Sequence, residues 1–221
     1  MRPGIRDLVA TMQGRIVLRA TVVVAVFLIL HGVDALTFDG RIFHIDAEQN
    51  LPTWTRTLLY AFAGGVWIVR YRLNDRHRGL CLSIGVLLVA FSIDDTVMGH
   101  EYLESQAEDP ESLIKVWQPL AGLAVAAIFV QSARRFTGID RWLFVAAAGS
   151  LLIGQGASAT NDDTGGAVTV LLSTVEQVGE AYFGIFLLAA GLPGAWRAVR
   201  YAARTADDAD LPEEERAVSA S

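Results

Sequence analysis

The sequence predicts an all-α fold: a polytopic membrane helix bundle with six transmembrane helices and both termini in the cytoplasm. Two observations support this prediction. The first is a set of apolar runs in a 221-residue chain that is 52% hydrophobic, at residues 18–38, 54–69, 80–98, 113–131, 142–159 and 167–192. A helix needs about 20 mostly apolar residues to cross a hydrocarbon core about 30 Å thick. The second is that 15 of the 18 Lys and Arg residues fall on one side of these runs.

The basic residues give the direction of each span in turn. Four of them precede the first span, and the positive-inside rule then places the N-terminus in the cytoplasm. The others follow spans two, four and six, so each even-numbered span returns to the cytoplasm. Only Arg41, Arg56 and Lys115 fall on the opposite side. The cytoplasmic set is Arg2, Arg6, Arg15, Arg19, Arg70, Arg72, Arg76, Arg78, Arg134, Arg135, Arg141, Arg197, Arg200, Arg204 and Arg216.

Spans two and five fit the criteria for a membrane helix least well. The second run is short, and the fifth is rich in small residues whose spacing permits close helix contact. At the inner end of span two, Trp67 is expected at headgroup level, because indole is apolar with one polar group. Pro193 is expected to end span six. A cleaved signal peptide is the alternative for span one, since a basic leader precedes the apolar stretch 21–30.

Composition limits the partners and the location. Residues 1–204 are expected to form the transmembrane domain, and residues 205–221 an acidic, disordered cytoplasmic tail. A net charge of −6 argues against a nucleic-acid partner, because phosphate neutralisation needs a basic face. The expected partner is the lipid bilayer, and a homodimer would suit a carrier this small. Almost all basic residues are Arg, which indicates a GC-rich prokaryote and hence its plasma (inner) membrane.

Ionisable residues collect in the outer half of three spans. Such groups are rare there, because an Asp or Lys at a helix centre costs about 2.5–3.5 kcal/mol. With a rise of about 1.5 Å per residue, the groups within the spans lie roughly 18–24 Å from the cytoplasmic ends. The candidate site residues are His31 and Asp34 in span one, Asp94 and Asp95 in span three with His100 and Glu101 beyond them, and Glu176 and Glu180 in span six.

The charge balance of this set limits its chemistry. Five of its carboxylates lie at one predicted depth, and no Lys or Arg is expected there to pair with them. We therefore expect protons or a bound cation to neutralise the acids. Oxygen ligands together with imidazole suit Zn, Mn or Fe.

The first functional hypothesis is a metal-dependent membrane enzyme acting at the outer leaflet. The candidate residues would hold a divalent metal, and one spare carboxylate would act as general base. A bound metal makes hydroxide available near neutral pH. Bis-histidine haem, held by His31 and His100, is a further option.

Two other classes of function use the same residues. In a proton- or cation-coupled transporter or channel, the acids would form a relay or binding site. In an accessory membrane subunit, the polar groups would bind the helices of a partner. The structural alternative is that each acid only caps or hydrogen-bonds a neighbouring helix.

One segment resembles a known pattern. Ser92, Asp94, Asp95, His100 and Glu101 fit [Ser/Thr]-x-Asp-[Asp/Glu]-x4-His-Glu, and a later span carries paired Glu followed by Gly. This resembles uncharacterised multi-spanning prokaryotic membrane proteins. The resemblance implies a repeated use of these acids and supplies no activity. The seven-span membrane metal-hydrolase superfamily has a late His-x-x-x-His pair that this chain lacks.

Overall fold

The described part of the chain is entirely helical. The computed structural model describes residues 11–37, 51–73, 77–97, 110–161 and 167–209, and these contain six α-helices and no strand. This confirms the all-α prediction. The helices are α2 (Met12–Thr37), α3 (Leu51–Arg72), α4 (Arg78–Val97), α6 (Pro110–Arg135), α7 (Gly138–Asn161) and α8 (Ala167–Ala209).

Four of these helices are long and apolar enough to cross a membrane. Their qualifying stretches lie in α2, α4, α7 and α8. Within the described residues, α3 and α6 are not among these four helices. Spans two and five were expected to fit these criteria least well. Helix α3, which contains the second run, does not meet them, whereas α7, which contains the small-residue fifth run, does.

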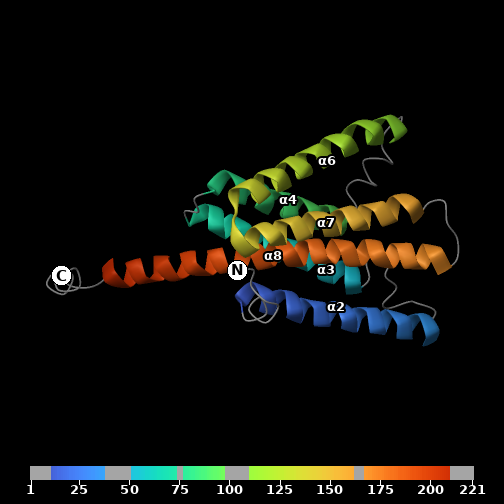
Figure 1. Ribbon diagram of the computed structural model, residues 1–221, viewed down its shortest axis with the longest axis horizontal. Helices are drawn as coiled ribbons and strands as arrows, with labels where there is room; N and C mark the ends of the chain where they lie inside the picture. The colour runs from blue at the N-terminus through green and yellow to red at the C-terminus, as the bar shows by residue number, and fades with distance from the viewer. Residues whose placement is uncertain (1–10, 38–50, 74–76, 98–109, 162–166, 210–221) are drawn as a thin grey trace.

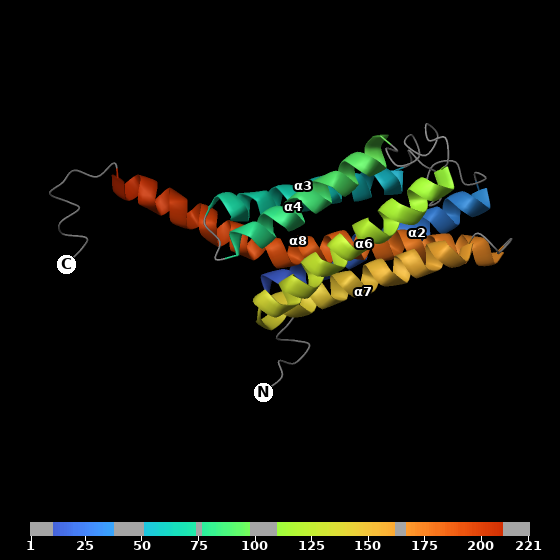
Figure 2. The same ribbon diagram turned by 90° about the horizontal axis from the view of Figure 1, so that it is seen from above.

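Helix α8 is the central element of the bundle. Figure 2 shows α3 and α4 on one side of it and α7 on the other, with α6 crossing obliquely from α7 toward α4, while Figure 1 shows α2 running along its remaining flank. Pro193 lies inside this helix, which continues to Ala209, so Pro193 does not end the helix, and the expectation that it ends span six stays a prediction. The preceding turn is supported from α3, where Arg70 Nη1 donates to the Ala190 carbonyl oxygen at 3.2 Å.

The contacts between α3 and α8 follow one repeating register. Arg56 faces Glu180, and the same separation of 124 positions brings Tyr60 to Gly184, Trp67 to Gly191 and Arg70 to Gly194. A constant difference in residue number means that these two helices run parallel. The pairs Thr57–Ser92 and Gly64–Gly85 have a constant sum instead, so α4 runs antiparallel to α3.

Large aromatic side chains of α3 lie against glycines of α8. Trp67 is fully buried, and its Nε1 donates to the Leu187 carbonyl oxygen at 3.0 Å. Trp67 therefore packs inside the bundle, and its expected position at headgroup depth stays a prediction. Further along, a Cβ atom on Gly184 would lie 2.8 Å from Cε1 of Tyr60. The absence of side chains at these glycines lets the two helices approach closely.

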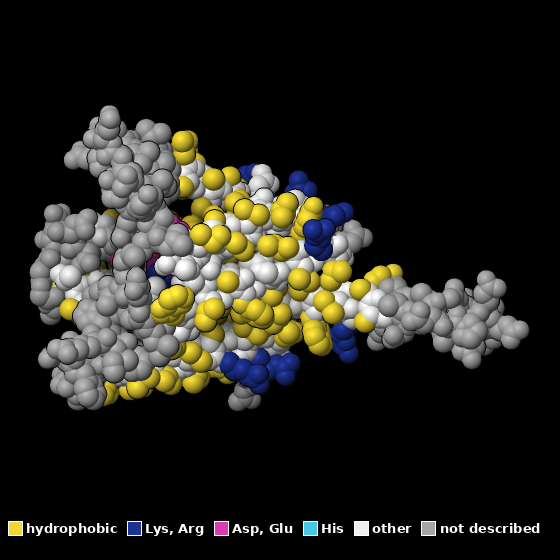
Figure 3. Space-filling view, turned by 180° about the vertical axis from the view of Figure 1, so that it is seen from behind, with side chains coloured by type: hydrophobic (Ala, Val, Ile, Leu, Met, Phe, Trp, Pro, Cys, Tyr) yellow, Lys and Arg dark blue, Asp and Glu magenta, His cyan; other side chains and the backbone are white. Residues whose placement is uncertain are grey.

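The outside of the bundle is apolar with a basic end. Figure 3 shows hydrophobic side chains over the middle of the surface and Lys and Arg side chains around the end from which α8 projects. Side chains such as Ile29, Leu123 and Leu152 are more than half exposed. Such a surface suits contact with lipid rather than with water.

We predict that Gly184→Ala destabilises the protein. The added methyl group would collide with the buried ring of Tyr60, whose hydroxyl is hydrogen-bonded to α8, and overpacking of this kind costs about 1–3 kcal/mol. The measurement is the free energy of unfolding in detergent micelles. The control is Gly156→Ala on α7, where a Cβ would meet no atom within 4 Å. Equal stability of the two variants would contradict the close contact between α3 and α8.

Candidate functional site

Arg56 lies at the centre of a polar cluster inside the bundle. Its Nε donates to Oδ2 of Asp95 at 3.0 Å and its Nη2 to Oδ1 of the same carboxylate at 3.1 Å. Its Nη1 donates to Oε1 of Gln177 at 2.6 Å and also pairs with the carboxylate of Glu180. A two-point guanidinium–carboxylate contact is among the strongest and most directional hydrogen-bonding arrangements in proteins. We call these four residues the Arg56 centre.

Three helices supply the Arg56 centre. Arg56 comes from the second turn of α3 and Asp95 from the last turn of α4. Gln177 and Glu180 come from α8, and because they are three residues apart they lie on one face of that helix. The centre therefore joins α3, α4 and α8 through charged hydrogen bonds.

The Arg56 centre is largely shielded from solvent. The side chains of Arg56, Asp95 and Glu180 are only 12%, 19% and 18% exposed. Two neighbouring side chains also form hydrogen bonds with Glu180, one with its backbone and one with its carboxylate. Tyr60 Oη donates to the Glu180 carbonyl oxygen at 2.8 Å, and Nε2 of Gln155 on α7 donates to Oε1 of Glu180 at 3.4 Å. Two carboxylates thus share one guanidinium in a setting that water reaches poorly.

This geometry corrects the charge balance expected from the sequence. The prediction that no Lys or Arg lies at the depth of the acids is wrong, because Arg56 pairs with both Asp95 and Glu180. Arg56 belongs to the outer basic residues by the positive-inside count, although it lies within the predicted second span. Arg56 belongs to helix α3, which begins at Leu51, and is therefore not a loop residue. Its side chain points into the bundle, where it contacts Asp95.

The other candidates have different positions. Asp94 is partly buried on α4, and its side chain points about 100° around the helix axis from that of its neighbour Asp95. Glu176 is partly buried on α8, one turn before Glu180. The side chains of His31 and Asp34 on α2 lie outside the described part, as do residues His100 and Glu101.

A metal site is neither supported nor tested by this arrangement. Among the side chains that the structure describes, no group of three or more His, Cys, Asp and Glu residues could hold a metal ion. Half of the proposed ligands lie outside that set. The divalent-metal hypothesis therefore stays a prediction.

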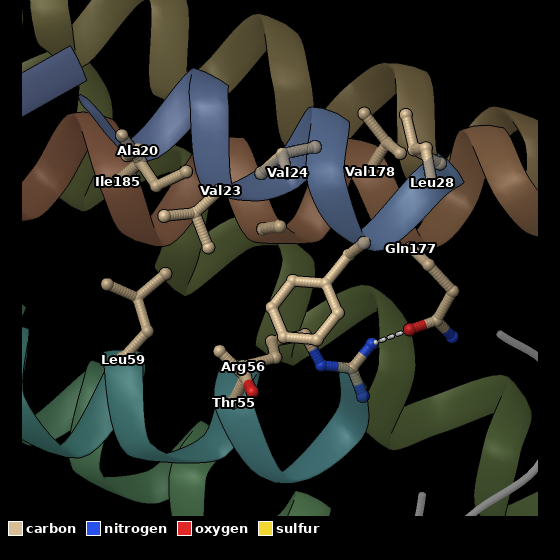
Figure 4. Close-up of a pocket in the computed structure, with 12 residues that line it drawn as sticks. Ala20, Val23, Val24, Leu28, Thr55, Arg56, Leu59, Gln177, Val178 and Ile185 are labelled. Carbon is tan, nitrogen blue, oxygen red and sulfur yellow. Dashed lines mark hydrogen bonds between the residues drawn. The ribbon is translucent and has the colours of Figure 1, made fainter. Parts of the chain in front are cut away.

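Neither Gln177 nor Tyr60 was among the predicted site residues, and the cavities around the Arg56 centre were not predicted. A cavity of about 220 Å³ lies between α2, α3 and α8, and Arg56 and Gln177 line it (Figure 4). A much smaller space of about 10 Å³ lies beside Asp95 and is lined by Thr53, Trp54, Thr57 and Thr96. No feature of a single sequence indicates which helix faces enclose such spaces.

Residues 15–193 match the family model described as "Domain of unknown function (DUF8692)", and the chain therefore belongs to that family. No curated protein and no solved structure matches the chain. The family is an uncharacterised one, as the resemblance in the sequence implies. The match shows neither that the acid and histidine motif is a feature of the family nor that the chain is prokaryotic, and both stay predictions.

We predict that Arg56→Met lowers the free energy of unfolding by about 3–5 kcal/mol, because it leaves two shielded carboxylates without their common partner. Chemical unfolding in micelles measures the change. Arg72→Met is the matched control, since Arg72 is an exposed residue of the same helix and its loss should change stability by no more than about 0.5 kcal/mol. An Arg56 variant as stable as the Arg72 variant would contradict the ion-pair geometry.

Proposed function

We propose that this member of a family of unknown function is a six-span protein of a prokaryotic plasma membrane. In this proposal, which we call the coupling proposal, a proton or small cation binds at the Arg56 centre as it moves. The observation that carries the proposal is the sharing of one guanidinium by two shielded carboxylates.

The six-span topology is supported by helix direction as well as by hydropathy. Four helices are apolar enough to cross a membrane. The parallel pair α3 and α8, and the antiparallel pair α3 and α4, have the relative directions that spans two, three and six would need. With six crossings and a cytoplasmic N-terminus, the C-terminus is also cytoplasmic.

The charge of the centre supports uptake of a cation. With Asp95 and Glu180 both ionised against Arg56, the hydrogen-bonded set has one negative charge in excess. An uncompensated charge away from water costs several kcal/mol. A proton on one carboxylate, or a small cation beside it, removes that excess, and intramembrane carboxylates commonly serve as relays of this kind.

Uptake of the cation would change how the helices are held. Glu180 belongs to α8, and Asp95 belongs to α4. Neutralising Glu180 weakens the attraction between α3 and α8, whereas the two-point contact to Asp95 keeps α3 on α4. A ligand shifts a conformational equilibrium by its different affinity for the two states. Proton binding at Glu180 therefore favours a state in which α8 is less tightly bound to α3.

We infer that water or an ion reaches the centre through the small space beside Asp95. The space beside this residue is about the size that holds a single water molecule. Its lining includes Trp54, which is 47% exposed, and the exposed residue Thr96. Asp95 is thus the member of the centre that lines this space.

A divalent-metal enzyme is the second candidate, favoured by the number of acids on α4 and α8. In this candidate Zn, Mn or Fe would bind to some of the predicted ligands. Arg56 already supplies positive charge between Asp95 and Glu180, so these two acids have less need of a metal than the sequence alone implies. The geometry of the described residues therefore favours the coupling proposal.

We predict that Glu180→Gln reduces proton or cation flux in proteoliposomes by about tenfold or more, because the amide cannot accept and release a proton. The assay follows an internal pH dye under an imposed pH gradient, with Na⁺ and K⁺ tested separately. Asp140→Asn is the matched control, because Asp140 bonds to Gln13 of α2 rather than to the Arg56 centre, and its flux should remain near that of the wild type.

Two outcomes would contradict the coupling proposal. One is wild-type flux no greater than that of empty vesicles for any of these ions. The other is equal flux for the wild type and Glu180→Gln. Stoichiometric Zn, Mn or Fe in the purified protein, lost in Glu180→Gln, would favour the metal candidate instead.

A further inference from the structure

The cavity between α2, α3 and α8 has one polar end and one apolar end. Figure 4 shows Arg56 and Gln177 together at one end and Ala20, Leu59 and Ile185 away from them. We propose that this cavity holds a segment of an acyl chain of a membrane lipid, with the ester carbonyl of that lipid beside Gln177 and Arg56. The inference rests on the proposed membrane topology and goes beyond the proposed coupling.

The size of the cavity favours part of a chain rather than a complete soluble ligand. Its volume of about 220 Å³ exceeds the roughly 150 Å³ of an engineered apolar cavity that binds benzene. It is smaller than the roughly 300–1,000 Å³ of typical small-molecule sites. Apart from Thr55, Arg56 and Gln177, all lining residues are hydrophobic. A hydrocarbon segment fits both the volume and the lining.

The cavity opens sideways, where lipid chains would lie in a membrane. Val23 of α2 lines the cavity and is still 50% exposed, so the space reaches the surface past this residue. Helix α2 is held by polar contacts elsewhere, including the hydrogen bond from Tyr182 Oη to Thr21 Oγ1 at 3.0 Å. A chain can therefore enter between α2 and α3 without breaking that contact.

The polar end selects an uncharged hydrogen-bond acceptor. Gln177 accepts the Arg56 hydrogen bond through Oε1, so its Nε2 offers two donors. The Arg56 guanidinium also only donates. An anionic group would meet Asp95 and Glu180 close behind Arg56, and like charges repel strongly in a setting of low dielectric. An ester carbonyl accepts hydrogen bonds without carrying that charge.

The test is photo-crosslinking in phosphatidylethanolamine vesicles that contain a lipid probe with a diazirine within one acyl chain. We expect the labelled peptides to come from α2, α3 and α8 around the cavity. Val24→Trp fills the cavity and should reduce labelling by about tenfold. Val22→Trp is the matched control, since Val22 is 57% exposed and does not line the cavity. Ala181→Phe is a second filling variant if Val24→Trp does not fold.

An ether-linked probe that lacks the carbonyl tests the polar end. We expect it to label the cavity less than the ester probe does, and we expect Gln177→Leu to abolish that difference. Labelling that is unchanged in the folded filling variants, or that is spread evenly over the exposed helix faces, would overturn the proposal. Equal labelling by the two probes would overturn the carbonyl assignment. Failure of the proposed membrane topology would be recognised separately, because the wild-type protein would then not insert into vesicles. The flux assay is independent of this test, since loss of flux in Glu180→Gln does not alter the labelling.

Discussion

The ion pairs of Arg56 connect three helices of this bundle at a point that is poorly reached by water. The guanidinium bonds to Asp95 of α4 through two atoms and to Glu180 of α8 through a third. Removing Arg56 would leave two shielded carboxylates without their common cation, which is more costly than losing an exposed salt bridge. The helix arrangement, the excess negative charge and the polar end of the lateral cavity all depend on this contact.

The packing between α3 and α8 holds the Arg56 centre in register. Tyr60 and Trp67 are positioned against Gly184 and Gly191 at the same sequence separation that joins Arg56 to Glu180. A side chain on either glycine would push the two helices apart. The hydroxyl of Tyr60 adds a hydrogen bond to the carbonyl of Glu180 itself. Close packing at the glycines and ion pairing at the centre therefore reinforce one another.

The helical class of this protein could be predicted from its sequence, because a long apolar run in a bilayer must satisfy its backbone hydrogen bonds within the segment, as an α-helix does. The role of Arg56 could not be predicted from the count of basic residues, which assigns it to the outer side by position alone. Its place within the second apolar run was the available signal. The burial of Trp67 depends on glycines 124 positions away, and hydropathy contains no information on such pairing. Convergence of Asp95 and Glu180 on one cation depends likewise on which helix faces meet.

The most direct measurement is solid-state NMR of the protein in lipid bilayers, with ¹⁵N in the arginine guanidinium groups and ¹³C in the side-chain carboxyl groups. We expect the Arg56 signals, identified by their loss in Arg56→Lys, to show dipolar contacts to the carboxyl carbons of both Asp95 and Glu180. Each contact should disappear in the corresponding Asp95→Leu or Glu180→Leu variant. An Arg56 guanidinium with no carboxyl carbon in contact would contradict the account.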